Sequence, residues 1–447
     1  MKNWQLLFPG KKTNAALQRI GRGGSDVKLW RMALQQFRKN KLAIWSFRFI
    51  IFLTIIALSA DFLANEKPLI CKYKDKVYFP VVREYLVDAG ISRWPADLVN
   101  VDWKKLDYQW SIFPPIPYLP QNLDHVNEHS VSPFGKQQLP SGRWRHWMGT
   151  DELGRDVLAG MLYGTRIALS IGIVSMGLAL LIGVFIGALA GFFGDDRLCI
   201  SRARLIFNII FGFLAFFYGL GSRSYILQDA LASSFGAFFV QLIISLFIIV
   251  CVMTFGNLCC LPFKKILWMK KKINIPVDLL LSRFIEIMNS IPTLFLIISV
   301  SAIVTRPSIF VVMVIIGLTA WTGIARFTRA ELLRIRNLEY IEAAKALGFT
   351  QFRILLKHAI PNALSPVLIA LAFGIANSIL VESVLSFLGI GVPAETITWG
   401  SLLSQAQQTP GAWWIAVFPG LAIFLTVTVY NLVGEGLTDA LDPKLKK

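Results

Sequence analysis

The side chains best suited to bind a metal are two histidines in the first third of the chain. His125 and His129 have the i, i+4 spacing that puts two ligands on one face of a helix. However, the stretch is not H-E-x-x-H, and prolines bracket it, so a helix is not expected there. No G-x-x-x-x-G-K-[ST] phosphate loop and no set resembling a nucleophile with its base occurs in the sequence. We therefore expect no metal site, no cofactor in this chain and no catalytic residues.

The five cysteines do not form a recognisable framework. Cys71 stands alone, whereas Cys199, Cys251, Cys259 and Cys260 lie in or beside apolar segments, and no C-x-x-C occurs. These spacings favour membrane-packed thiols over zinc or thiol–disulfide chemistry.

Other polar residues stand inside long apolar segments. Asn377, Ser378 and Glu382 share one such segment, and ionisable groups within a membrane are costly and often functional. We expect this group to face a polar path across the membrane, the alternative being a hydrogen bond that packs two helices. Glu286 is expected at a helix end as a partner of Arg283.

The segments that must position these residues are membrane spans. The chain has 447 residues, of which 55% are hydrophobic and 16% charged, against roughly 25% charged residues in soluble domains. A spanning helix needs about 20 mostly apolar residues. About eight segments qualify, approximately at 43–60, 167–191, 205–221, 235–261, 284–304, 308–326, 364–388 and 413–433. The sequence thus predicts an all-α polytopic membrane protein with about eight spans.

The net charge of +18 indicates how these spans are oriented. Lys and Arg concentrate in alternate short loops and at both ends, which places those loops and both termini in the cytoplasm. Because the basic residues lie between apolar segments and form no single patch, a nucleic-acid partner is not expected.

Two segments outside the spans have distinctive compositions. The cytoplasmic N-terminal segment 1–42 includes 27–41, where apolar residues at helical spacing among Lys and Arg predict a helix lying on the membrane surface, or else a solvated start to the first span. The periplasmic region 61–166 is rich in Trp and Pro and predicts a small ordered outer loop domain with many turns.

The cytoplasmic loop 337–361 predicts two short helices joined by a turn. Asn337 is suited to cap the first helix, Gly348 to end it in a left-handed conformation, and Thr350 to cap the second. Small residues on the first helix permit close approach, and Tyr340, Leu347 and Phe352 supply anchors. A compact helix below the membrane with an apolar face is typical of a docking element.

The spacing Glu-Ala-Ala-x-x-x-Gly at 342–348 resembles the signature of ABC importer permeases. Further stretches resemble the oligopeptide/dipeptide/nickel permeases, and within them the C-type subunit and the Yej-type (oligopeptide/microcin C) subgroup. They are 28–48, 64–69, 79–80, 149–156, 387–391, 399–400 and 431–443, the last with Glu435 where Asp is often seen.

This resemblance implies a type I ABC importer transmembrane fold and a role for particular residues. The loop 337–361 becomes a coupling loop, with ATPase-coupling residues Tyr340, Glu342, Ala343, Ala344, Gly348 and Phe352. The candidates for contact with an external binding protein are Asp151, Arg155, Asp156 and Trp399, and the pathway candidates remain Asn377, Ser378 and Glu382.

It also implies partners: a homologous B-type permease, two cytoplasmic ATPase subunits or domains that bind ATP and Mg²⁺, a periplasmic or lipid-anchored substrate-binding protein, and membrane lipid. The location implied is the bacterial inner membrane. The chain is then a non-catalytic permease subunit for peptides or peptide-like substrates. A secondary transporter driven by ions or protons is the alternative, and peptide, nickel complex and peptide antibiotic all stay open as substrates.

The chain departs from the family in one region. Family members have six spans, but here 195–277 separates the second span, 167–191, from the core helices of 278–447. Both ends of this insert are basic, which predicts a hairpin of two spans that returns to the cytoplasmic side. We expect it on the periphery, facing lipid. The alternative is a pair of amphipathic elements on the membrane surface.

Overall fold

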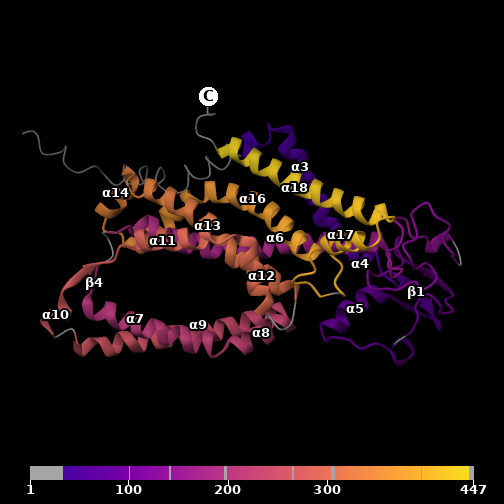
Figure 1. Ribbon diagram of the computed structural model, residues 1–447, viewed down its shortest axis with the longest axis horizontal. Helices are drawn as coiled ribbons and strands as arrows, with labels where there is room; N and C mark the ends of the chain where they lie inside the picture. Colours follow the sequence, from indigo (N-terminus) through magenta and orange to yellow (C-terminus); the bar gives the residue numbers. More distant parts are fainter. Residues whose placement is uncertain are drawn as a thin grey trace, which may run out of the picture.

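A computed structural model describes residues 34–99, 101–139, 142–195, 199–263, 266–303, 308–393 and 395–441. Within them seven helices are long and apolar enough to cross a membrane, or up to eight if one bent pair counts as a span. The predicted all-α polytopic architecture is thus confirmed. The long helices are α3 (Lys41–Leu58), α6 (Val157–Ala188), α7 (Arg202–Phe216), α9 (Phe235–Phe263), α13 (Ile309–Ile335), α16 (Ile360–Phe387) and α18 (Trp413–Leu441). They run roughly parallel in Figure 1.

Helix α6 lies at the centre and packs closely along α13. A side chain at Gly183, Gly187 or Gly191 would press against backbone carbonyl oxygens of α13, at 2.8 Å for Trp321 and 2.5 Å for Ala325 and Arg329. Glycine at every fourth position therefore lets the two backbones approach closely. A π-helical turn, Leu189–Phe193, ends α6.

The span predicted at 284–304 is not one straight helix. It consists of α11 (Val277–Ser290) and α12 (Thr293–Ile303), which meet at 80°. The bend falls at Ile291-Pro292, and Ile291 is extended, with φ −90° and ψ 123°. A residue before proline is driven out of the helical region, so the predicted span is a bent pair of helices.

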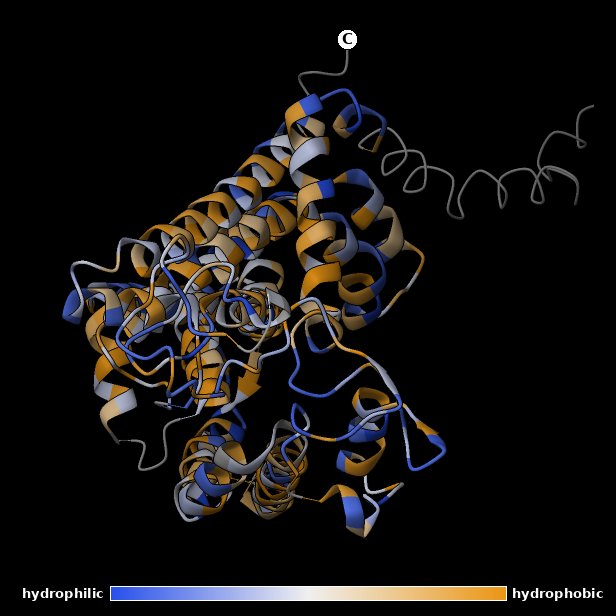
Figure 2. Ribbon diagram, turned by 90° about the vertical axis from the view of Figure 1, so that its right-hand side faces the viewer, coloured by the Kyte–Doolittle hydropathy of each residue, from blue (hydrophilic) through white to orange (hydrophobic). Residues whose placement is uncertain are grey.

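The outer region between α3 and α6 contains a small antiparallel sheet. Its strands are β1 (Ile70–Tyr73), β2 (Lys76–Tyr78) and β3 (Trp110–Ile112), in the order β2-β1-β3, with Cys71 opposite both Tyr78 and Ser111. The remaining short elements are α4 (Ala60–Leu63), α5 (Pro80–Asp88) and the 3-10 turns Ala96–Leu98 and Gly142–Trp144. Figure 2 shows these loops in front of the predominantly hydrophobic helices.

The insert forms a helical hairpin beside the other helices (Figure 1). Helix α7, a π-helical turn (Phe217–Gly221) and α8 (Ser224–Ser233) pack along α9. At the far end α10 (Leu267–Lys270) and β5 (Lys272–Asn274) follow, and β5 pairs with β4 (Cys199–Ser201). In the apolar 18-residue stretch of α9 that could span a membrane, only 6% of the residues are buried. Two spans in the insert agree with the predicted fold, while their contact with lipid stays a prediction.

Contact between the hairpin and the core concentrates at the end that carries α8. Leu231 of α8 and Phe238 of α9 join an apolar cluster with Ile297 and Val311.

The predicted interfacial helix 27–41 falls partly outside the described residues, from 27 to 33. Phe37, which is described, lies against Gly436 near the end of α18.

Candidate functional site

Three residues separate the end of α13 from the helix α14 (Glu339–Ala346). Its N-cap is Leu338 with no side-chain cap bond, so the prediction that Asn337 caps it was wrong. The helix ends at Gly348, whose φ is +80°. Gly348 N donates to Lys345 O at 2.9 Å and Phe349 N to Ala344 O at 3.2 Å, the two bonds of a Schellman motif. The predicted glycine stop is thereby confirmed.

The following helix is α15 (Gln351–Ile354), and Thr350 caps it as predicted by accepting from Arg353 N. A π-helical turn, Leu355–Ala359, then joins α15 to α16. The rings of Phe349 and His358 stack at 6.3 Å, and the Arg353 guanidinium lies 4.8 Å from the Phe349 ring. These contacts hold the two short helices in a fixed arrangement.

One face of α14 is built into the core. Ile341 is fully buried and Ala344 is 7% exposed. They share a cluster with Phe192 at the end of α6, Ile335 at the end of α13 and Ala359 before α16. Any displacement of α14 therefore displaces the ends of three long helices, because close-packed interiors transmit strain.

The opposite face of α14 is exposed and largely apolar. Tyr340 and Leu347 are 41% and 74% exposed, and Ala343 lies between them at helical spacing. Phe352 on α15 is 57% exposed, and Glu342 is exposed as well. Of the residues assigned to coupling, Ala344 alone points into the core. The other five are on the surface, and we name the patch of Tyr340, Ala343, Leu347 and Phe352 the docking face.

A cavity of about 570 Å³ lies among α6, α12, α13 and α16. Its lining is mainly apolar, with a few polar side chains, namely Thr293, Thr319, Thr322 and Asn377. The Thr322 hydroxyl donates to Asn289 Oδ1 of α11 at 3.0 Å. A mostly apolar lining with a few polar groups is typical of small-molecule sites.

The structure separates the three pathway candidates. Asn377 lines the cavity, but Ser378 and Glu382 are 1% exposed and do not line it. Glu382 accepts from the Ser386 hydroxyl at 2.6 Å within α16. This bond lies within one helix and does not link two helices, and the buried Glu382 is not brought to the cavity with Asn377. Arg283 and Glu286 pair at 2.7 Å as predicted.

The outer stretch 149–156 forms a loop tied to distant parts of the chain. The Asp151 carboxylate accepts from Arg155 Nε at 2.6 Å and from the backbone N–H of Leu153 at 3.0 Å. Trp414 of α18 donates its indole N–H to Thr150 O at 3.1 Å. Asp151 is 1% exposed, so it holds the loop together instead of presenting a surface.

Asp156 has two internal roles. It caps α6 by accepting from Ala159 N at 2.7 Å, and it accepts from the fully buried His146 at 2.7 Å. The other ring nitrogen of His146 is 3.1 Å from Asp124. The sequence analysis missed this Asp–His–Asp bridge, although an Asp directly before an apolar helical run is a recognisable N-cap signal.

Trp399 begins α17 (Trp399–Gln408) and is 2% exposed. Its indole donates to Met161 O of α6 at 3.1 Å, over Gly164, where any side chain would collide with the ring. Asp151, Asp156 and Trp399 are thus buried within the chain. Their placement corrects the expectation that they form a contact surface for another protein.

The His125–His129 pair does not form a helical ligand pair. His129 has a φ of +64°, and His125 lies 2.5 Å from Glu128. Among the described residues no group of three or more potential metal ligands comes together.

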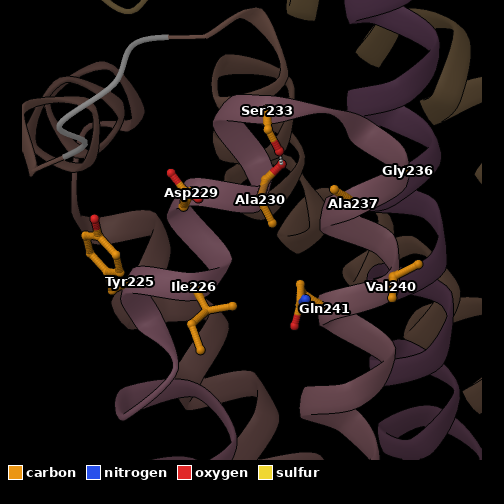
Figure 3. Close-up of a pocket in the computed structure, with 9 residues that line it drawn as sticks. All are labelled: Tyr225, Ile226, Asp229, Ala230, Ser233, Gly236, Ala237, Val240 and Gln241. Atoms are coloured by element: carbon orange, nitrogen blue, oxygen red, sulfur yellow. Dashed lines mark hydrogen bonds between the residues drawn. The ribbon is translucent and has the colours of Figure 1, made fainter.

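A second cavity, of about 490 Å³, lies in the hairpin between α8 and α9 (Figure 3). Tyr225, Asp229 and Gln241 are among its polar lining residues. Arg223 donates to Gln241 at 2.6 Å and to the buried Ser245 at 3.1 Å, which stabilises the hairpin where α8 begins.

Comparison with known families gives two matches. The family described as "Binding-protein-dependent transport system inner membrane component" matches residues 266–447. The "N-terminal TM domain of oligopeptide transport permease C" matches residues 28–76. Over these residues the chain is similar to binding-protein-dependent transport permeases. The first match includes α14 and most of the cavity, and the region between the two matches contains the insert up to the end of α9.

Several curated permeases are similar to the chain over most of its length. The peptidoglycan transport system permease protein YejE of Agrobacterium fabrum is 28% identical, covering 92% of each chain. The inner membrane ABC transporter permease protein YejE of Escherichia coli is 28% identical over 91% of this chain and 95% of its own. The dipeptide transport system permease protein DppC of Bacillus subtilis is 28% identical over 72% and 76%.

A solved chain of the MetNI methionine ABC transporter, in an inward-facing conformation, is a more distant match. It shares 16% identity over 63% of this chain and 96% of its own, with a TM-score of 0.39.

Proposed function

We propose that this chain is the permease subunit of an ATP-driven importer and supplies half of a pathway for peptides or peptide-like molecules. It is a multi-pass inner-membrane protein and a non-catalytic subunit. ATP and Mg²⁺ are assigned to partner subunits. The observation that carries the proposal is the two-sided burial of α14, with one face in the core and the other on the surface.

The docking face is suited to an ATPase surface. Its apolar side chains stand on two short helices, and the Gly348 motif that ends α14 and the Thr350 cap that begins α15 fix the connection between them. A partner that receives this face buries Leu347 and Phe352, which are now more than half exposed. Apolar and aromatic anchors of this kind dominate the energetics of interfaces.

The connection from α14 to the spans supports a coupling role. Ile341 and Ala344 pack against residues at the ends of α6, α13 and α16. Since α13 and α16 also line the cavity around Asn377, a rigid-body movement of the ATPases reaches the cavity walls through packed helices. We assign Asn377 to the pathway and Glu382 to the packing of α16.

The substrate class rests on the relatives. One carries dipeptide transport in its name and another peptidoglycan transport, and both substrates contain peptide bonds. We propose a peptide or peptide-containing substrate delivered by an external binding protein. A homologous permease completes the pathway, and two ATPases bind at the cytoplasmic side, where both termini lie.

The contact with the binding protein is assigned to exposed neighbours of the outer loop. Trp147 and Leu153 are 60% and 52% exposed beside the buried Asp151 and Asp156. The buried residues hold this surface in place without touching the partner.

The test is co-purification of the tagged chain, expressed with its genomic neighbours, in mild detergent. Leu347→Asp places a charge on the docking face without filling or emptying the core, and Gly348→Pro disrupts the end of α14. We expect both variants to lose the ATPases and keep the second permease. Phe134→Asp, at an outer residue that is 84% exposed, is the matched control and should keep both.

If no ATPase co-purifies with the wild type, the importer proposal is wrong and a secondary transporter driven by ions or protons becomes the better hypothesis. If the wild type retains the ATPases and Leu347→Asp retains them equally, the importer proposal stands but the docking face is wrong.

A further inference from the structure

The two ends of the inserted hairpin meet in a short strand pair. Ile200 of β4 lies opposite Ile273 of β5, and Arg202 N donates to Lys271 O at 3.0 Å. The pair thus places the start of α7 next to the residues that follow α10. We call this end of the insert the basic ribbon, and it comprises Arg202, Arg204, Ile266, Leu267, Trp268, Lys270, Lys271 and Lys272.

The charge of the insert is one-sided. Over the insert 195–277 the sequence has nine basic residues and three acidic residues, Asp195, Asp196 and Asp229. Asp229 belongs to α8, at the opposite end of the hairpin, and of the insert's basic residues that the structure describes only Arg223 lies there too. The ribbon therefore has positive charge that the insert itself does not balance.

Two acidic residues near the ends of the insert, Asp195 and Asp278, are engaged elsewhere. Asp278 forms an ion pair with Arg329 of α13, and Asp195 accepts from Leu279 N at 3.0 Å. In the part of the chain that the structure describes, no carboxylate lies within ion-pair distance of Lys270, Lys271 or Lys272. All three lysines are exposed.

Large apolar side chains stand exposed among these cations. Ile266, Leu267 and Trp268 are 49%, 91% and 60% exposed. The Arg202 guanidinium lies 4.9 Å from the Trp268 ring, so one arginine is oriented by the aromatic residue beside it. Exposed Trp and Leu next to clustered Lys and Arg are typical of a surface that inserts among lipid headgroups.

The position of the ribbon in the molecule fits this reading. It connects the ends of α7 and α9, both long and apolar enough to span a membrane, so it lies where their apolar surface stops. We propose that the basic ribbon is a binding site for anionic phospholipid headgroups of the adjacent leaflet. Arg202 presents a planar fork of donors to a phosphate, Lys271 and Lys272 add point charges, and Leu267 and Trp268 lie between acyl chains.

The experiment uses the full-length chain in nanodiscs of phosphatidylethanolamine and phosphatidylglycerol. After transfer to detergent, native mass spectrometry counts the phosphatidylglycerol molecules that each chain retains. The test variant combines Arg202→Gln, Lys271→Gln and Lys272→Gln. The matched control removes three positive charges from the outer region by Lys76→Gln, Arg93→Gln and Lys105→Gln. A third variant, with Arg202→Lys, Lys271→Arg and Lys272→Arg, keeps the charge.

We expect the test variant to retain phosphatidylglycerol at least about tenfold less than the wild type, because each basic residue near an anionic surface adds about 1 kcal/mol. The control and the charge-preserving variant should retain it. All variants are compared at equal monodispersity on size exclusion, so that a misfolded chain is not counted.

Equal retention by the test variant and the control would overturn the proposal. Equal loss in both would also overturn it, since net charge and not the ribbon would then be responsible. Unchanged lipid retention with loss of a co-purifying acidic protein would assign the ribbon to a protein partner instead.

Discussion

The inner stretch 339–348 and the outer stretch 149–156 are both recognisable from sequence, yet the chain uses them in opposite ways. In the inner stretch Leu347 is 74% exposed and the glycine at 348 ends a surface helix. In the outer stretch Asp151 and Asp156 are almost fully buried. A recurrent sequence pattern thus marks a surface in one case and an internal lock in the other, and only burial separates the two.

The largest expected effect is on the outer lock. Asp156→Ala removes the cap of α6 and leaves the buried His146 without one of its two carboxylate partners. We expect a loss of roughly 3 kcal/mol, the sum of a cap and a buried hydrogen bond. Thermal unfolding of the solubilised chain measures it. Glu152→Ala changes an exposed acid in the same loop and should shift stability by no more than about 0.5 kcal/mol. Similar losses in both variants would contradict the internal role of Asp156.

A smaller effect is expected at the inner stretch. Gly348 has a φ of +80°, and a Cβ placed there would meet no atom within 4 Å. The cost of Gly348→Ala is therefore one of backbone conformation alone, about 1 kcal/mol in thermal unfolding. Asn tolerates this conformation better, so Gly348→Asn should lose less. If Ala and Asn behave alike, the left-handed conformation is not what the position requires.

The stability of the fold is expected to depend on pH through Lys104 in the outer region. Burial lowers the pKa of Lys104 from 10.5 to about 8, against the opposing effect of Asp124, Glu66 and Asp102. Its ammonium lies 3.5 Å from the centre of the Tyr118 ring. Between pH 8 and 10.5 the unfolded chain binds the proton and the folded chain releases it, so stability rises with pH across that window. Unfolding midpoints of the wild type and of Lys104→Met, compared from pH 7.5 to 10, measure the difference. Parallel curves would contradict the lowered pKa.

The last prediction concerns the rates at which two cysteine thiols react, and it involves essentially no change in stability. Cys71 is 1% exposed, and burial raises its pKa to about 11, whereas Cys199 is exposed. At pH 8 we expect a maleimide to modify Cys71 at least about a hundredfold more slowly than Cys199. Single-cysteine variants analysed by mass spectrometry give the two rates.

In intact cells an impermeant reagent should reach Cys199 only after the inner membrane is opened. Labelling before that would contradict a cytoplasmic position for the basic ribbon.

The features predicted correctly from sequence depend on neighbours along the chain. Hydropathy over about 20 residues located the spans, and the pattern from Glu342 to Thr350 located the helix stop and the following cap, because these interactions reach only a few residues. The bend at Pro292 was also within reach of local reasoning, since proline restricts the residue before it. There the length of the apolar run was given too much weight.

The features that were missed depend on contacts between distant residues. Asp151 and Asp156 are polar and precede a span, so local sequence favours a surface position. They are buried because loop residues such as Asn127 and His146, and Trp414 from α18, close over this stretch. Likewise Glu382 stands in an apolar segment whether it faces a path or a neighbouring helix. Its burial, with 1% of the residue exposed, depends on the rotation of α16 and on the elements packed around that helix.

The pairing of β4 with β5 has a consequence for how this chain could have acquired its insert. Cys199 lies directly opposite Asn274, so the chain leaves the core and re-enters it at nearly the same point. To the flanking helices the whole hairpin is equivalent to a tight turn, since its length does not alter the separation of its ends. Such a module can be gained, lost or exchanged in evolution without re-threading the helices on either side. The core can thereby stay under the constraints of its partners while the hairpin diverges at its own rate.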